Sequence, residues 1–152
     1  MVLKEYTGPD PEPGALVVKT TVANVCGSDL HQWRGEFDVV KFGRPLPQIL
    51  GHEMPGTVHA LGEGLTTDPR GLPLKVGDRV IWRDFYPCGR CRACLNGITR
   101  ACRRARTYLN TSADEPPHFV GAFGDYYYVF PNAALFKVPD ELGDDLVAGF
   151  NC

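Results

Sequence analysis

Four closely spaced cysteines near the middle of the chain constrain its fold more than any other feature. Cys88, Cys91, Cys94 and Cys102 follow the pattern C-x2-C-x2-C-x7-C. A spacing of two residues lets neighbouring sulfurs converge on one ion, and four thiolates complete the tetrahedral coordination of a structural zinc. Residues 88–106 have little apolar content, so this segment cannot fold around a core of its own. We therefore predict a zinc-binding lobe over residues 88–106 that is folded by its metal.

Two other interpretations of these cysteines are weighed against zinc. Bacterial ferredoxin-type iron–sulfur segments also begin C-x2-C-x2-C, but their fourth cysteine follows after three residues and precedes proline. Here Cys102 follows after seven residues and precedes Arg103. Disulfides require an oxidising compartment, and residues 1–20 contain Pro, Glu and Asp where a signal peptide has an apolar stretch. We therefore expect a cytosolic (cytoplasmic) protein and favour zinc.

The lobe is also rich in arginine, which fits a metal bound by four thiolates. Such a site carries a net negative charge that guanidinium groups can offset. The formal net charge of the whole chain is −2, which makes an RNA-binding use of these arginines the weaker interpretation and gives no pull toward a membrane. We expect neither nucleic acid nor membrane as a partner. The arginines concerned are Arg90, Arg92, Arg100, Arg103, Arg104 and Arg106.

The rest of the sequence predicts a single, mainly β domain with few short helices. Glycines (17) and prolines (13) separate short segments rich in β-branched and aromatic residues. A short helical turn capped by Ser28 or Asp29 and a helix over residues 139–147 with Asp140 at its N-terminus complete the pattern. A small β-barrel or sandwich fits best. The expected strands cover residues 15–25, 56–60, 79–85, 124–130 and 134–138.

Two further cysteines and a histidine suggest a second zinc site. Cys26 follows the first expected strand, His52 lies in the segment Gly-His-Glu, and Cys152 is the last residue. Two thiolates and one neutral imidazole give zinc a neutral site with its fourth position free, as in a catalytic site. Three residues so far apart are also compatible with ordinary buried side chains, so their neighbours in the sequence decide the interpretation.

Several short motifs occur in a fixed order around these residues, and together they are specific. They resemble the N-terminal domain of the zinc-dependent medium-chain alcohol dehydrogenases, whose fold is a GroES-like β-barrel. The resemblance covers nearly the whole chain, from about residue 14 to residue 152. The motifs are C-G-S-D-L-H at 26–31, G-H-E at 51–53 with Gly56, V-G-D-R-V at 76–80, and the four-cysteine lobe.

The resemblance implies two zinc sites. Cys26, His52 and Cys152 would bind a catalytic zinc, and the four lobe cysteines would bind a structural one. Asp29 would orient His52 by accepting the free N–H of its ring. Glu53 would lie just behind the catalytic metal and enter its coordination during ligand exchange.

The resemblance also implies a path for the proton of the substrate. Zinc would lower the pKa of the bound alcohol, Ser28 would accept its proton, and His31 would be a later station of the relay. A hydride would then pass to a nicotinamide, NAD or NADP, leaving an aldehyde or ketone. The plainer alternative is that Ser28 only caps a turn and His31 is a surface histidine.

The dinucleotide-binding part of such an enzyme has no counterpart in this sequence. The nearest match to G-x-G-x-x-G, at residues 62–67, has threonine in place of its third glycine and runs into a loop. In the family a Rossmann domain follows, and the sequence stops where that domain would begin. We therefore expect residues 1–152 to form the catalytic domain only, inactive in hydride transfer by itself, of an enzyme that is a homo-oligomer at full length.

Three residues fall near positions where the family lines its substrate pocket: Trp33, Trp82 and Asp84. The carboxylate of Asp84 would favour a polar or cationic alcohol over a long apolar one. A competing hypothesis from another class is a standalone zinc-binding or interaction module in which the lobe is the working part. That hypothesis leaves the ordered motifs around Cys26 and His52 unexplained.

Overall fold

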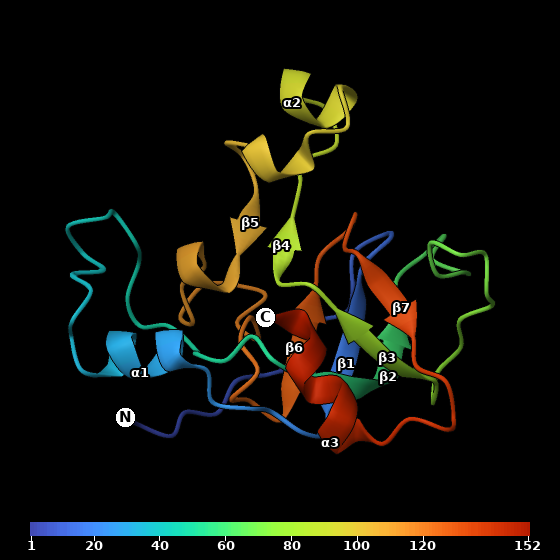
Figure 1. The fold of residues 1–152 in the computed structure, drawn as a ribbon, viewed down its shortest axis with the longest axis horizontal. Helices are drawn as coiled ribbons and strands as arrows, with labels where there is room; N and C mark the ends of the chain where they lie inside the picture. The colour runs from blue at the N-terminus through green and yellow to red at the C-terminus, as the bar shows by residue number, and fades with distance from the viewer.

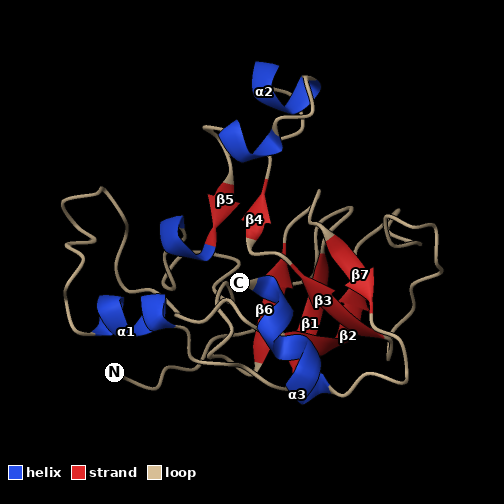
Figure 2. Ribbon diagram, viewed as in Figure 1, coloured by secondary structure: helices blue, strands red, loops and turns tan.

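A five-stranded antiparallel sheet forms the body of the molecule. The computed structural model describes residues 1–152, and the strands lie in the order β6-β1-β2-β3-β7. Figure 1 shows the strands packed closely together, and Figure 2 shows that the helices are short and lie around them. The prediction of a mainly β domain with few helices is confirmed. The strands are β1 (Leu16–Thr20), β2 (Pro55–Leu61), β3 (Arg79–Trp82), β6 (Tyr126–Val129) and β7 (Leu135–Lys137).

The core is formed largely by buried side chains of this sheet and is rich in aromatic residues. The ring of Trp82 on β3 meets that of Tyr127 on β6 at a centroid distance of 5.1 Å, in an edge-to-face arrangement. Val18 on β1 and Val58 on β2 are cross-strand partners and are both fully buried. Full burial of one such side chain contributes roughly 1.5–3 kcal/mol. The aromatic segment before residue 130 is therefore part of the core.

The cysteine-rich lobe projects from the sheet on a two-stranded hairpin. Its strands are β4 (Phe85–Tyr86) and β5 (Arg106–Thr107), and between them lie α2 (Arg92–Leu95) and a 3-10 turn, η1 (Thr99–Ala101). In Figure 1 the lobe extends away from the sheet, with α2 at its tip. Between residues 88 and 106 only Cys102 is buried. As expected, the lobe has no apolar core of its own.

The remaining helices are α1 (Gly27–Trp33), η2 (Tyr108–Asn110), and α3 (Asp144–Val147), which continues as η3 (Ala148–Asn151). Of these, α1 lies to one side of the sheet and α3 lies in front of it (Figure 2). The C-terminus lies between the sheet and the lobe hairpin (Figure 1). None of the helices is long and apolar enough to span a bilayer.

Two predicted strands differ in extent from those observed. The strand expected over residues 15–25 ends at Thr20, because the chain then leaves the sheet and keeps only an isolated bridge between Asn24 and Glu53. In place of the single strand expected over residues 79–85, the structure has two separate strands. β3 ends at Trp82 and pairs with β2 and β7, whereas β4 begins at Phe85 and pairs with β5 in the second sheet. A continuous β-type pattern gives no sign of such a change of partner.

Two predicted helix starts are wrong. The helix expected from residue 139 begins at Asp144 with Gly143 as its N-cap, because Pro139 and Leu142 close a separate turn through a 3.2 Å backbone hydrogen bond. Asp140 is therefore not a cap. The N-cap of α1 is Cys26, not Ser28 or Asp29. Asp29 lies in the first turn of α1, where its carboxylate accepts the N–H of Cys26 at 3.0 Å.

Candidate metal centres

The four lobe cysteines converge on one point. The sulfurs of Cys88, Cys91, Cys94 and Cys102 all lie within 4.8 Å of one another. The Sγ atoms of Cys91 and Cys94 are 3.5 Å apart. A tetrahedral zinc with Zn–S bonds of about 2.3 Å places its sulfurs about 3.8 Å apart, so the observed spacing fits zinc. Four protein sulfurs leave no position for a substrate, so a zinc ion bound here would be of the structural kind.

The electrostatics of the lobe also favour a bound cation. The pKa of Cys88 is lowered to about 6, mainly by a hydrogen bond from the backbone N–H of Arg90. A hydrogen bond from the backbone N–H of Cys94 likewise lowers the pKa of Cys91. Burial and the neighbouring sulfurs raise the pKa of Cys94 to about 12. Burial and the neighbouring sulfurs therefore oppose ionisation of Cys94, and a divalent cation would remove this repulsion.

The six lobe arginines are all exposed. Only Arg106 forms an ion pair, with Glu12 at 3.8 Å, and its guanidinium also lies over the ring of Phe130 at 4.7 Å. The other five form no ion pair. They are placed to offset the negative charge of a metal bound by four thiolates.

A second cluster forms where three distant parts of the chain meet. The donor atoms of Cys26, His52, Glu53 and Cys152 lie within 4.8 Å of one another, and the two sulfurs are 3.6 Å apart. The structure thus brings together the three predicted ligands and adds the carboxylate of Glu53. Hydrogen bonding with Cys26, and to a smaller extent with Glu53, raises the pKa of Cys152 to about 11. This set of sulfur, imidazole and carboxylate donors also suits zinc.

Local contacts fix the segments around Glu53 and Cys152. Glu53 is held by the hydrogen bond from the N–H of Asn24 to its carbonyl oxygen, at 2.9 Å. Asn151, next to Cys152, donates from its side chain to the carbonyl oxygen of Trp82 at 2.6 Å. Gly51, next to His52, has φ of 92°, and a Cβ there would lie 2.8 Å from the ring of Phe123. Glycine is therefore required where the chain enters the site.

Asp29 holds two of these segments together. Its carboxylate is 2% exposed and accepts the N–H of Cys26 at 3.0 Å and that of Gly51 at 3.1 Å. Its Oδ1 atom lies 3.6 Å from Nδ1 of His52, a buried nitrogen with no hydrogen-bond partner. A carboxylate facing one ring nitrogen leaves the other nitrogen for a metal. At 3.6 Å the two atoms form no hydrogen bond, and the orienting role of Asp29 stays a prediction.

Tyr108 was not predicted, although it contacts the site directly. Its ring stacks on that of His52, with centroids 5.2 Å apart and planes 16° from parallel. Burial raises the pKa of Tyr108 to about 12, against hydrogen bonds from Gln32 and Ser28 that lower it. In the sequence Tyr108 is one tyrosine after an arginine-rich segment. No pattern there marks it as a neighbour of His52.

The proposed relay residues lie on α1. Ser28 is half-buried in the first turn, beside the Tyr108 hydroxyl. His31 lies one turn later and is exposed, with its Nδ1 atom bonded to the carboxylate of Glu36 and its ring edge-to-face with Phe37. The helix therefore extends from the second cluster to solvent.

The three expected pocket residues occupy different environments. Trp33 is 64% exposed at the end of α1, whereas Trp82 is 1% exposed within the core. Asp84 is half-buried and forms no ion pair. Burial raises the pKa of Asp84, and the nearby His52 partly opposes this. Asp84 therefore interacts electrostatically with His52, one residue of the second cluster.

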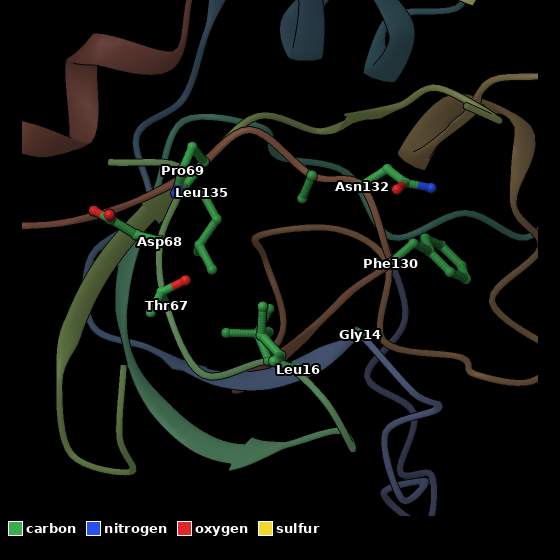
Figure 3. A pocket seen from close by; sticks show the side chains of 10 residues that line it. Gly14, Leu16, Thr67, Asp68, Pro69, Phe130, Asn132 and Leu135 are labelled. Carbon is green, nitrogen blue, oxygen red and sulfur yellow. The ribbon is translucent and has the colours of Figure 1, made fainter. Parts of the chain in front are cut away.

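A separate cavity of about 220 Å³ lies at another part of the sheet. Figure 3 shows Leu16 and Leu135 beside it, with Thr67, Asp68 and Asn132 around it. Asp68 is saturated by hydrogen bonds from Arg70 and from backbone N–H groups. None of the lining residues belongs to either cysteine cluster, so this cavity is not part of the candidate metal centres.

A sheet that carries a projecting four-cysteine lobe and a second cysteine–histidine cluster defines a mainly β, metal-binding domain. The chain belongs to the alcohol dehydrogenase GroES-like domain family, whose model matches residues 12–140. The family and the GroES-like fold inferred from the ordered motifs are thereby confirmed.

Named relatives are dehydrogenases. The chain is 33% identical over 143 residues to 5-exo-hydroxycamphor dehydrogenase of Pseudomonas putida, covering 94% of this chain and 37% of that protein. It is 32% identical over 143 residues to L-threonine 3-dehydrogenase of Deinococcus radiodurans, with the same coverage. The chain thus spans about two-fifths of the length of the curated relatives it matches.

Solved structures show the same fold. An alcohol dehydrogenase of Thermotoga maritima superposes with a TM-score of 0.83 at 32% identity, covering 97% of this chain and 40% of that chain. A zinc-binding dehydrogenase of Sinorhizobium meliloti, bound to NADP, gives a TM-score of 0.68 at 29% identity, covering 93% of this chain and 36% of that chain.

Proposed function

We propose that this chain is the zinc- and substrate-binding domain of a zinc-dependent alcohol dehydrogenase. The enzyme would oxidise an alcohol to an aldehyde or ketone with NAD or NADP as hydride acceptor. The observation that carries this proposal is the convergence of Cys26, His52, Glu53 and Cys152 within 4.8 Å. Membership of the alcohol dehydrogenase GroES-like family supports it.

The two clusters would hold two zinc ions with different tasks. The lobe would hold a structural ion, since all four of its donors are cysteines. Cys26, His52 and Cys152 would hold the catalytic ion, with Glu53 as a fourth, exchangeable donor. A zinc ion bound there supplies Lewis-acid chemistry that makes an alkoxide accessible near neutral pH.

Ser28 and His31 would move the substrate proton. The Ser28 Oγ atom would accept the proton inside the site, and His31, one turn along α1, would pass it to solvent. The half-buried position of Ser28 and the exposed position of His31 support this order. Asp29 would keep the His52 ring oriented throughout.

The nicotinamide cofactor would be bound by a Rossmann domain that accompanies this one. The length of the relatives, of which this chain matches about two-fifths, and the NADP bound to the Sinorhizobium meliloti dehydrogenase support this arrangement. A cytoplasmic homo-oligomer acting on a small-molecule alcohol or aldehyde completes the proposal.

The substrate would meet Asp84 near the second cluster. A half-buried carboxylate without an ion-pair partner favours a substrate with a cationic group or extra hydroxyls. Trp33 would border the same pocket at the end of α1, and Trp82 would support it from the core. Replacing Asp84 with alanine in the intact dehydrogenase should shift preference toward apolar alcohols. An unchanged preference would remove Asp84 from this role.

Metal analysis tests the proposal directly. We expect two zinc ions and no iron per chain, and one zinc ion in the His52→Ala variant. Cobalt substitution should give absorption of two kinds, one from four thiolates and one from mixed donors that His52→Ala removes. One metal per chain, with no effect of His52→Ala, would favour the standalone zinc-module alternative. Iron with inorganic sulfide would refute the zinc assignment of the lobe.

A further inference from the structure

We propose that Tyr108 is a positioning residue for His52 and that the four-cysteine lobe holds Tyr108 in place. Binding of a metal ion to the four sulfurs of the lobe would then raise the metal affinity of the second cluster. This inference rests on the proposed function, because it assumes that the second cluster binds a metal. It concerns a connection between the two clusters, whereas the proposed function treats them separately.

The contact between Tyr108 and His52 is close and enclosed. The two rings stack at 5.2 Å and 16°, and Tyr108 is only 3% exposed. On its edge, the His52 ring faces the Asp29 carboxylate at 3.6 Å. The carboxylate fixes one edge of the imidazole and the phenol ring fixes one face. Together they restrict both the direction and the tilt of the ring.

Local hydrogen bonds hold Tyr108 at this position. Its hydroxyl accepts a hydrogen bond from Nε2 of Gln32, on α1, at 3.4 Å. The 3-10 turn that contains Tyr108 is closed by Thr107, whose side chain accepts the N–H of Leu109 at 3.2 Å. The backbone N–H of Thr107 in turn donates to Oδ1 of Asn110 at 2.7 Å. The turn is also anchored to the body of the molecule, because Tyr108 belongs to the buried core cluster and Nε2 of Gln48 donates to the carbonyl oxygen of Leu109.

The lobe hairpin holds the same turn from its other side. β4 and β5 pair through two residue pairs only, Phe85 with Thr107 and Tyr86 with Arg106. Tyr108 directly follows Thr107, and Asp84 directly precedes Phe85. Both residues at the base of the hairpin thus interact with His52. Tyr108 stacks on its ring, and His52 lowers the pKa of Asp84 against the effect of burial.

The ends of this short hairpin are joined by the cysteine cluster. Cys88 lies two residues after β4, Cys102 lies four residues before β5, and the N–H of Cys88 donates to Sγ of Cys102 at 3.4 Å. Because the lobe has no apolar core, a metal on its four sulfurs would hold the lobe ends of the two strands together, while Tyr86 anchors their base in the core. Loss of that metal would loosen the hairpin and, through it, the seating of the Tyr108 ring on His52. Because binding free energies are linked, metal at the second cluster would also tighten the lobe.

Cobalt titration of the purified protein tests the positioning role. We expect Tyr108→Leu, which removes the ring but keeps a hydrophobic side chain, to weaken Co²⁺ binding at the second cluster about 10-fold or more. Tyr108→Phe keeps the stacked ring and should bind within about 3-fold of the parent protein. The mixed-donor absorption band should be broader in Tyr108→Leu than in the parent protein, and Tyr108→Phe should have the band shape of the parent. The four-thiolate absorption should be unchanged in both variants.

A matched control comes from a second tyrosine–histidine pair. Tyr126 packs against His59 with centroids 4.9 Å apart, and neither residue belongs to a cysteine cluster. Tyr126→Leu should leave both cobalt signals unchanged, which separates positioning from general loss of packing. Equal Co²⁺ affinity in Tyr108→Leu and the parent would overturn the positioning role.

The link to the lobe needs its own variant. Cys94→Ser weakens the lobe site without altering any residue near His52, and we expect it to lower Co²⁺ affinity at the second cluster as Tyr108→Leu does. In the double variant Cys94→Ser/Tyr108→Leu the two losses should not add, since both act through Tyr108. Fully additive losses would overturn the link. Absence of cobalt from the second cluster of the parent would overturn the proposed function itself, whereas normal binding there that no variant alters would overturn only this inference.

Discussion

The Nδ1 atom of His52 lies 3.6 Å from Oδ1 of Asp29, and both side chains are largely removed from solvent. The same carboxylate accepts the N–H groups of Cys26 and Gly51. One buried side chain therefore connects the start of α1 to the loop before β2, which carry two of the candidate metal ligands. The geometry of the second cluster depends on this carboxylate.

Asp29→Asn should weaken the second metal site and the fold together. The amide keeps one oxygen acceptor but loses the charge, so we expect a roughly 10–100-fold loss of Co²⁺ affinity. The free energy of unfolding should fall by about 2 kcal/mol, because charged hydrogen bonds to buried backbone N–H groups are weakened. Asp38→Asn is the control, since Asp38 accepts the N–H of Lys41 in an exposed loop. Similar effects of the two substitutions would contradict the special position of Asp29.

Removing metal from the lobe should unfold it locally. Because residues 88–106 bury only Cys102, their amide protons should exchange rapidly after chelation, whereas those of Leu16–Thr20 in the middle of the sheet should stay protected. Hydrogen exchange followed by mass spectrometry, before and after chelation, measures this. Protection of the lobe that survives complete removal of metal would show that the lobe folds without it.

Asp68 should make stability depend on pH in the acid range. Burial alone would raise the pKa of its carboxyl, but hydrogen bonds from Arg70 and from three backbone N–H groups outweigh burial and lower it to about 2. A folded pKa below the unfolded value of 3.8 stabilises the protein fully above about pH 4, and this stability is lost as the pH falls toward about 2. The contribution is about 2 kcal/mol.

Urea unfolding of the parent and of Asp68→Asn at several pH values measures this contribution. The difference in unfolding free energy between them should be largest near neutral pH and should shrink below about pH 4. Comparison with the variant separates Asp68 from the other carboxyl groups that titrate in the same range. A difference that stays constant down to about pH 2.5 would contradict the assignment.

Gly62→Ala should destabilise the protein strongly. A Cβ at this position would lie 2.0 Å from the carbonyl oxygen of Glu12 and 2.8 Å from that of Ala15. Both oxygens accept backbone hydrogen bonds, from the N–H groups of Ala15 and Gly62, which a shift would strain. Overpacking of this kind costs roughly 1–3 kcal/mol, and contact with backbone places Gly62 at the upper end. Gly8→Ala, where a Cβ meets no atom within 4 Å, should be neutral in the same thermal-unfolding experiment. Equal melting temperatures of the two variants would refute this.

The lobe was the part of the fold most open to prediction. Its four cysteines lie close in sequence, and such spacing nearly forces the sulfurs to meet. The strands at residues 56–60 and 134–138 were also placed within a residue of their observed bounds, since local propensity and turn residues agree there. The break between β3 and β4 was not predictable, because pairing with a different sheet is decided by residues far along the chain.

The sequence by itself determined the candidate ligands, the ordered motifs of the family and the mainly β character of the chain, because these depend on residue type and short spacing. Only the tertiary structure decided that Cys26 and Cys152 lie 3.6 Å apart, that Trp82 is a core residue, and that Tyr108 stacks on His52. The physical reason is that long-range contacts arise from the packing of whole elements. A side chain such as Tyr108 acquires its partner only when the lobe hairpin, α1 and the sheet have taken their places.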